Sequence, residues 1–222
     1  MDVSDLSATL ALALPFAVAG AAGGLVADRI ASRWPRHDDG TIRPPGLRTV
    51  AVAATGALAL GALPARFDTP LNVVLLVAWF AALLILMATD LDQRLLPDVI
   101  TLPLIPVSLV VLVAGWNPLL AGKDLGVVSG IAAAVAAPAF LALTSRLFRG
   151  GLGMGDVKLA VSMGLVLGLY RFVGGFLVGA LVFAAVAVVL LATRRIGLRS
   201  AVPFGPMLVL AGFAGALLES AW

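Results

Sequence analysis

The sequence contains no cysteine, a single histidine and a single glutamate, and these absences remove several classes of function. Without cysteine, the chain cannot form disulfides, thiolate metal sites or a cysteine nucleophile. The one histidine, His37, lies between Arg36 and Asp38 in a polar segment. It cannot supply a histidine pair for zinc, and its position does not suit a Ser-His-Asp triad. We therefore expect no metal site and no cofactor.

Charged residues are also few, at 12% of the 222 residues, whereas 61% are hydrophobic. Soluble globular domains carry about 25% charged residues, so this balance indicates a membrane protein. The N-terminal stretch MDVSDLSATLALALPF has no Lys or Arg before its apolar run, although a secretory signal peptide requires a basic segment there. We expect residues 1–6 to form a short acidic tail and the run after it to be a retained helix.

Long apolar runs follow one another along the chain. A hydrocarbon core about 30 Å thick requires roughly 20 apolar residues for one helical crossing. By this rule we predict an all-α integral membrane protein, one polytopic domain over residues 1–222 with about eight transmembrane helices and no internal repeat. The Ala, Gly and Val content of the runs suits close helix packing in lipid. The eight segments, of which the second and sixth are short, are residues 8–30, 47–64, 71–89, 99–115, 126–147, 156–170, 172–193 and 203–220.

Lys and Arg residues gather on one side of this predicted topology. With the N-terminus outside, twelve fall in inner segments and three in outer segments, and cytoplasmic loops favour positive charge. This bias supports the orientation and the even number of crossings, and it accounts for the pI of about 10.2 without nucleic-acid binding. The inner residues are Arg29, Arg33, Arg36, Arg43, Arg48, Arg94, Arg146, Arg149, Lys158, Arg194, Arg195 and Arg199; the outer ones are Arg66, Lys123 and Arg171.

Two aspartates stand at the edges of predicted helices. Asp90 ends the third segment and Asp156 begins the sixth. Because two crossings separate them, we expect both at the cytoplasmic edge of the membrane. An ionisable residue at membrane depth costs roughly 2.5–3.5 kcal/mol, so such a residue usually has a function.

Structural roles compete with catalytic ones for the acidic residues. Asp156 and Asp98 are well placed to cap the helices that follow them, since helix N-termini favour negative charge. We interpret Asp92 as a solvated loop residue. Asp90 is different, because the macrodipole disfavours a negative charge near a helix C-terminus. A purely structural role would favour Lys or Arg there, so Asp90 is the strongest candidate for a functional carboxylate.

The stretch GGLGMGDVKLA, residues 150–160, places four glycines before Asp156. Gly150, Gly151, Gly153 and Gly155 are compatible with a flexible loop. Alternatively, they keep the backbone bare so that an extended substrate strand can lie against it. A phosphate-binding loop is a weaker alternative, because the spacing matches neither nucleotide fingerprint.

Two carboxylates facing each other at a dry edge would suit the chemistry of an aspartyl protease. Close like charges cannot both ionise, so the pair shares one proton. The ionised carboxylate would draw a proton from the attacking water, and the protonated one would polarise the scissile carbonyl. Because the helix ends differ, we expect Asp156 to be the ionised partner and Asp90 the protonated one.

Several motifs together resemble the type IV prepilin peptidases. GLGMGDVKL resembles their GxGD motif, TDLDQRLLPDVITLPL their other aspartate motif, and PFGPML at 203–208 a third segment. In the first predicted helix, Gly24, Arg33 and Pro35 fit the pattern G-x-x-x-N-x-x-x-x-R-x-P, with Asp28 in place of the usual Asn. The resemblance covers most of the chain.

The resemblance implies a multi-pass aspartyl endopeptidase of the bacterial inner membrane, surrounded by membrane lipid. Such enzymes remove the basic leader from type IV prepilins or pseudopilins at the cytoplasmic face, after a glycine. The catalytic aspartates carry over to Asp90 and Asp156. The expected substrate-binding residues are Pro97, Asp98, Gly153, Gly155 and Lys158, with a lipid-headgroup anchor as the alternative for Lys158.

One region departs from the family. Many members carry a larger cytoplasmic domain with two CxxC pairs after the first span and also methylate the new N-terminus. Here only about residues 34–46 occupy that place, without cysteine, so we expect peptidase activity without methyl transfer. The alternatives are another GxGD protease, such as a preflagellin peptidase, and a small transporter whose carboxylates line an ion path. A transporter would be expected to carry its acids near the midplane.

Overall fold

The computed structural model describes residues 3–36, 40–147, 153–195, 197 and 203–218. These residues form helices and no strand, which confirms the prediction of an all-α protein. The elements are α1 (Val3–Ala31), α2 (Leu47–Gly61), the 3-10 helix η1 (Leu63–Ala65), α3 (Pro70–Gln93), α4 (Asp98–Val113), α5 (Gly126–Leu147), α6 (Met154–Ala192) and α7 (Gly205–Leu217). His37 and two of the candidate glycines, Gly150 and Gly151, lie outside the described residues.

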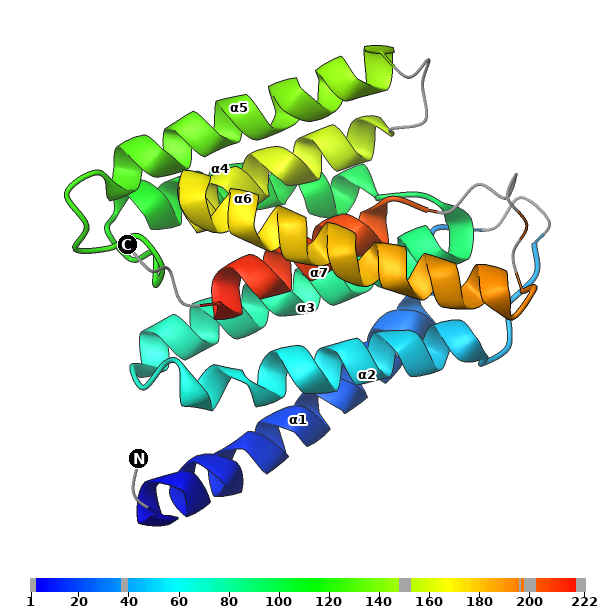
Figure 1. Ribbon diagram of the computed structural model, residues 1–222, viewed down its shortest axis with the longest axis horizontal. Coiled ribbons are helices and arrows are strands. Elements are labelled where there is room, and N and C mark those ends of the chain that lie inside the picture. Colours follow the sequence, from blue (N-terminus) through cyan, green and yellow to red (C-terminus); the bar gives the residue numbers. More distant parts are fainter. Residues whose placement is uncertain (1–2, 37–39, 148–152, 196, 198–202, 219–222) are drawn as a thin grey trace. The chain divides into compact units, whose positions relative to one another are not determined.

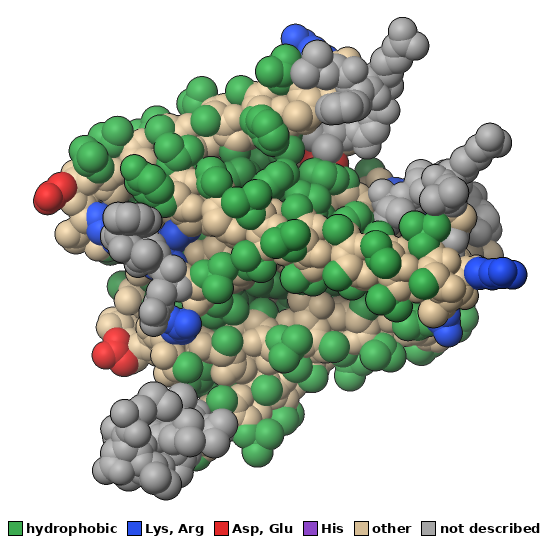
Figure 2. Space-filling model, viewed as in Figure 1, with side chains coloured by type: hydrophobic (Ala, Val, Ile, Leu, Met, Phe, Trp, Pro, Cys, Tyr) green, Lys and Arg blue, Asp and Glu red, His purple; other side chains and the backbone are tan. Residues whose placement is uncertain are grey.

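Among the described residues, five helical stretches are long and apolar enough to cross a membrane: Ala11–Ala31, Leu47–Ala65, Pro70–Gln93, Gly126–Arg146 and Met154–Ala192. Helices α4 and α7 are apolar but shorter. Large apolar side chains are widely exposed, as at Leu58, where 77% of the residue is accessible. Figure 2 shows hydrophobic side chains spread over the visible helix faces, with charged ones at the helix ends. Such surfaces suit lipid contact. The count of eight crossings and the outside N-terminus stay predictions.

Helix α6 is divided at Gly168, where φ is 69° and ψ is 176°. Its 39 residues would extend about 58 Å if straight, roughly twice the hydrocarbon thickness of a bilayer. Along α6, the contacted residues of α5 run toward the start of α5 before the break and back toward its end after the break. Before it, Gly164 approaches Ala134 and Leu165 approaches Gly130; after it, Leu169 contacts Ser129 and Phe176 contacts Phe140. The two halves therefore form a helical hairpin, as the ribbon shows (Figure 1).

Side chains satisfy the backbone groups that this break leaves without helical partners. The amide nitrogen of the buried Asn117 donates to the carbonyls of Leu165 and Val166 at 3.1 and 3.0 Å. On the other side, the backbone N–H of Leu169 donates to Ser129 Oγ at 2.9 Å. Because buried backbone polar groups require such partners, these contacts stabilise the turn. The sequence predicted a boundary at residue 171, between the sixth and seventh segments. It placed Asn117 in a loop and did not indicate a role for it.

The chain forms two compact units, Met1–Pro97 and Asp98–Trp222. The first contains α1, α2, η1 and α3, and its core includes Leu63, Phe80 and Leu83. The second contains α4 to α7, with Leu159, Met163 and Leu208 fully buried. The single domain expected from the sequence stays a prediction.

Helices α1 and α2 pack backbone against backbone. A Cβ added at Gly20 would lie 2.1 Å from the carbonyl oxygen of Gly56, and one at Gly24 would lie 2.5 Å from that of Val52. Gly20 and Gly24 are four residues apart and therefore lie on one face of α1. Small residues at this spacing let helices approach closely within lipid, as the composition predicted.

Replacing Gly20 by alanine is expected to lower the Tm of the purified protein in detergent. The added Cβ would force the two backbones apart, and overpacking of this kind costs about 1–3 kcal/mol. Gly23→Ala is the matched control, because it lies on the same helix and its Cβ would meet no atom within 4 Å. Equal Tm values for the two variants would contradict the close packing of α1 against α2.

Candidate functional site

Asp90 lies in the last turn of α3, as predicted, and is only 6% exposed. The helix ends because Arg94 adopts a left-handed conformation, with φ 55° and ψ 40°. The N–H of Arg94 donates to the carbonyl oxygen of Asp90 at 2.9 Å. Pro97 follows three residues later, where its ring disfavours continued helix. The chain thus holds a buried carboxylate at the negative end of a helix, where a structural role is disfavoured.

Asp156 lies at the opposite kind of helix end. Helix α6 begins after Gly153, and Asp156 occupies its third position. Its Oδ2 accepts a hydrogen bond from the backbone N–H of Gly153 at 3.0 Å. The carboxylate therefore stabilises the helix start, which supports the structural role considered for it. Asp156 is also only 6% exposed, so its carboxylate, a group capable of acid–base chemistry, is largely shielded from water.

Neither backbone conformation nor packing against the described residues requires glycine at position 153. Its φ of −70° and ψ of 151° are accessible to any residue. Among the described residues, an added Cβ would meet the carboxylate of Asp156, at 3.4 Å, and the nitrogen of Gly155, at 3.9 Å. Gly164, in contrast, has no room for a Cβ, which would lie 2.5 Å from the backbone nitrogen of Ala134. A reason for glycine at 153 must therefore lie outside the described contacts.

Asp98 and Lys158 come together although 60 residues separate them. Asp98 begins α4, and Lys158 lies in the first turns of α6. Lys158 Nζ donates to Asp98 Oδ1 at 2.7 Å, and the two side chains are 25% and 58% exposed. A pair this exposed stabilises a fold by about 0–1 kcal/mol. The pair therefore adds little to stability, and what it provides is two charged groups beside the start of α6. A role for Lys158 as a lipid-headgroup anchor stays an alternative.

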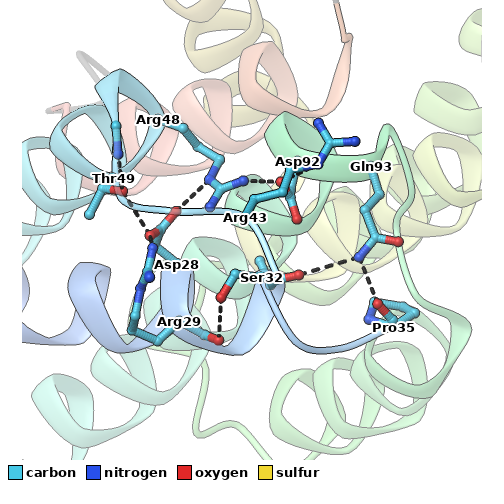
Figure 3. A network of polar contacts seen from close by, with 11 residues as sticks. Asp28, Arg29, Ser32, Pro35, Arg43, Arg48, Thr49, Asp92 and Gln93 are labelled. Carbon is cyan, nitrogen blue, oxygen red and sulfur yellow. Dashed lines mark hydrogen bonds and ion pairs between the residues drawn. The ribbon is translucent and has the colours of Figure 1, made fainter. Parts of the chain in front are cut away.

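The interpretation of Asp92 as a solvated loop residue is wrong. Asp92 lies within α3, its side chain is fully buried, and its Oδ1 accepts a hydrogen bond from Arg48 Nη1 (Figure 3). Arg43 Nε lies 3.8 Å from the same oxygen. The arginine partners lie more than 40 residues earlier in the chain, so local sequence could not reveal them. A carboxylate inside a helix among apolar neighbours requires such compensation.

Asp28 completes this buried network. Arg48 Nε donates to Asp28 Oδ1 at 2.5 Å, and Thr49 Oγ1 donates to Asp28 Oδ2 at 2.8 Å, while Arg29 also pairs with Oδ2. Asp28 is the position at which the resembled pattern has Asn. Aspartate carries a negative charge that asparagine lacks, and the guanidinium of Arg48 compensates this charge. Sequence reasoning missed this pairing, although an acid within an apolar run and an arginine starting the next run were visible signals.

A second contact ties the end of α3 to the end of α1. Gln93 Nε2 donates to the backbone carbonyls of Ala31 and Pro35, at 3.3 and 2.8 Å (Figure 3). Together with the Arg48 contacts, it holds the last turn of α3 against the end of α1 and the start of α2. This turn is the one that carries Asp90.

The predicted site residues fall into both compact units. Asp90 and Pro97 belong to the first unit, and Asp98, Gly153, Gly155, Asp156 and Lys158 belong to the second. The pairing of Asp90 with Asp156 therefore stays a prediction. Within the described ranges, no group of three or more His, Cys, Asp or Glu side chains is suited to hold a metal ion.

Comparison with known proteins assigns the chain to a family. Residues 75–193, which include both Asp90 and Asp156, match the model of the type IV leader peptidase family. A Burkholderia pseudomallei (strain 1026b) protein named prepilin leader peptidase/N-methyltransferase is 36% identical over 168 residues, 72% of this chain and 51% of its own. A protein of the same name from Aeromonas hydrophila is 35% identical over 179 residues, 77% of this chain and 54% of its own.

The chain spans about half the length of the curated relatives it matches. No solved structure matches it. The family model covers more than half of its 222 residues, in the region with both candidate aspartates. The chain belongs to the type IV leader peptidase family.

Proposed function

We propose that the protein is an aspartyl endopeptidase of the bacterial inner membrane that removes the basic leader from type IV prepilins or pseudopilins, after a glycine. The observation that carries the proposal is the family match over residues 75–193, the stretch containing Asp90 and Asp156. The names of the relatives add prepilins as the substrate class. The buried positions of both aspartates, each at a helix end, further support it.

Asp90 and Asp156 are the proposed catalytic pair. The macrodipoles of their helices favour an ionised Asp156 and a protonated Asp90. Asp156 takes a proton from water as the water oxygen attacks the scissile carbonyl, and Asp90 donates a hydrogen bond to the carbonyl oxygen. Collapse of the tetrahedral intermediate breaks the C–N bond, and the leaving nitrogen takes the proton that Asp156 received from the water. These steps require no metal or cofactor.

Gly153 is proposed to leave space for the substrate backbone beside Asp156. This proposal is supported by the φ and ψ of Gly153, which any residue can adopt, and by the room that the described residues leave for a Cβ there. Gly155 extends the same surface, and the Asp98–Lys158 pair and Pro97 are proposed to contact the peptide nearby. An extended strand can approach a backbone closely only where no Cβ stands in the way.

Methyl transfer is not part of the proposed function, although the names of the relatives include it. The connection between α1 and α2 covers only residues 32–46 and contains no cysteine. A segment of this size leaves little room for a methyl-donor pocket.

The topology proposed for this function has eight crossings with the N-terminus outside. The hairpin in α6 supports it, because the two halves of α6 account for the sixth and seventh predicted segments. Eight crossings return both Asp90 and Asp156 to the cytoplasmic side, where the leader of a newly made prepilin lies.

Cysteine labelling tests this topology directly, because the chain has no cysteine of its own. Single cysteines replacing Asp68, Asp124 or Tyr170 are expected to react with an impermeant maleimide in intact cells. Cysteines replacing Gly40 or Arg195 are expected to react only after permeabilisation. Labelling of position 195 but not 170 in intact cells would contradict the topology.

Asp90→Asn and Asp156→Asn are each expected to lower kcat/KM for leader removal by roughly 10²–10⁴-fold, since each removes a proton-transfer partner. The measurement is the mass shift of a panel of prepilins co-expressed with each variant. Asp68→Asn, an exposed aspartate in another loop, is the control. Unchanged cleavage by either variant would move the catalytic role to Asp92 or Asp98.

Gly153→Ala and Gly153→Ser are both expected to lower kcat/KM roughly tenfold, which corresponds to about 1.4 kcal/mol. Either Cβ would occupy space proposed for the substrate strand. The serine variant separates this effect from helix stability, because Ser is a favoured N-cap and Ala is not. Full activity of Gly153→Ser with reduced activity of Gly153→Ala would show that position 153 serves only the helix start.

A further inference from the structure

Two acidic side chains leave the last turn of α3 in nearly opposite directions. At 3.6 residues per turn, Asp90 and Asp92 are about 200° apart around the helix axis. The proposed function uses Asp90, whereas Asp92 is held by Arg48. A contact that fixes the direction of Asp92 fixes the rotation of this turn, and with it the direction in which Asp90 points.

Arg48 is built to provide such a contact, because it bridges carboxylates from two other helices. Its Nε donates to Asp28 on α1 and its Nη1 donates to Asp92 on α3, while Arg48 itself belongs to α2 (Figure 3). A guanidinium is planar and presents its donors in a fixed fork. The directions of the two carboxylates are therefore linked through one rigid group.

The burial of this network makes its arrangement hard to change. The side chains of Asp28 and Asp92 are fully buried, and that of Arg48 is 15% exposed. By contrast, Arg43 lies at the rim, with 52% of its side chain exposed and Nε 3.8 Å from Asp92. Separating a buried ion pair leaves an uncompensated charge, so alternative rotations of the α3 turn are strongly disfavoured.

We propose that Arg48, anchored by Asp28, is a positioning residue that sets the direction of Asp90 through Asp92. The assignment rests on the proposed function, because it takes Asp90 as a catalytic carboxylate. Arg48 does not touch the reacting atoms in this scheme. Its effect passes through the last turn of α3. In this turn the backbone N–H of Arg94 donates to the carbonyl oxygen of Asp90.

The test uses a variant that removes the charges of Asp28, Arg48 and Asp92 together. Arg48→Gln alone would take a cationic partner from both buried carboxylates and leave them only the more exposed Arg29 and Arg43, so such a protein is expected to fold poorly. The triple variant Asp28→Asn, Arg48→Gln, Asp92→Asn keeps similar side-chain volumes and carries none of the three charges. It is expected to retain a Tm close to that of the wild type, while its kcat for leader removal falls roughly 10–100-fold, as misplacement of a catalytic group does. KM is expected to change less than about twofold, since the network does not bind substrate.

Hydrogen exchange gives a second readout that needs no substrate. The amides of residues 90–96 are expected to exchange faster in the triple variant than in the wild type, because the turn is no longer held by Asp92. Arg43→Gln is the control: it removes a neighbouring cation at the rim and is expected to change neither kcat nor exchange.

The outcomes separate the positioning role from the proposed function. Wild-type kcat or wild-type exchange in a folded triple variant would overturn the positioning role, as would an equal effect of Arg43→Gln. If the wild type cleaves no prepilin but exchange still rises in the triple variant, the proposed function fails while the clamp on the α3 turn is supported. Loss of kcat with unchanged KM and faster exchange supports both.

Discussion

A charge buried among apolar helices must be compensated, and the first unit is organised around this requirement. At the centre of its ion-pair network, the Arg48 guanidinium from α2 contacts two fully buried carboxylates, one from α1 and one from α3. Close packing of Gly20 against Gly56 aligns α1 with α2 along their lengths, but it does not fix how their ends meet α3. Arg48 supplies that restraint, because it contacts both buried carboxylates, and its removal would take a cationic partner from each of them.

The positions of the helices could be predicted from the sequence because a helical crossing needs a minimum apolar length. The ends of the two helices that carry Asp90 and Asp156 also followed from local signals. Pro97 excludes a continued α3, and the glycines before Asp156 favour a helix start after them. Asp90 therefore lies at the end of its helix and Asp156 at the beginning of the other, as expected.

The side-chain pairings could not be predicted, because they join residues far apart in sequence. Asp92 has the local sequence surroundings of a loop residue, and its contact with Arg48, 44 residues away, accounts for its burial. The role of Asn117 also depends on a distant partner. It lies in a Pro- and Gly-containing connection, and its use in satisfying the break in α6 depends on a contact across 48 residues. Apolar periodicity contains no information about such partners.

The hairpin in α6 bears on how the protein enters the membrane. A connection that turns at Gly168 places very little polar chain between two apolar helices, with Arg171 the one charged residue near the turn. The translocation machinery would then have to move almost no hydrophilic loop across the bilayer at this point. The two halves can partition into lipid together as one preassembled pair, so a polar insertion at the turn would hinder biogenesis more than it would disturb the finished fold.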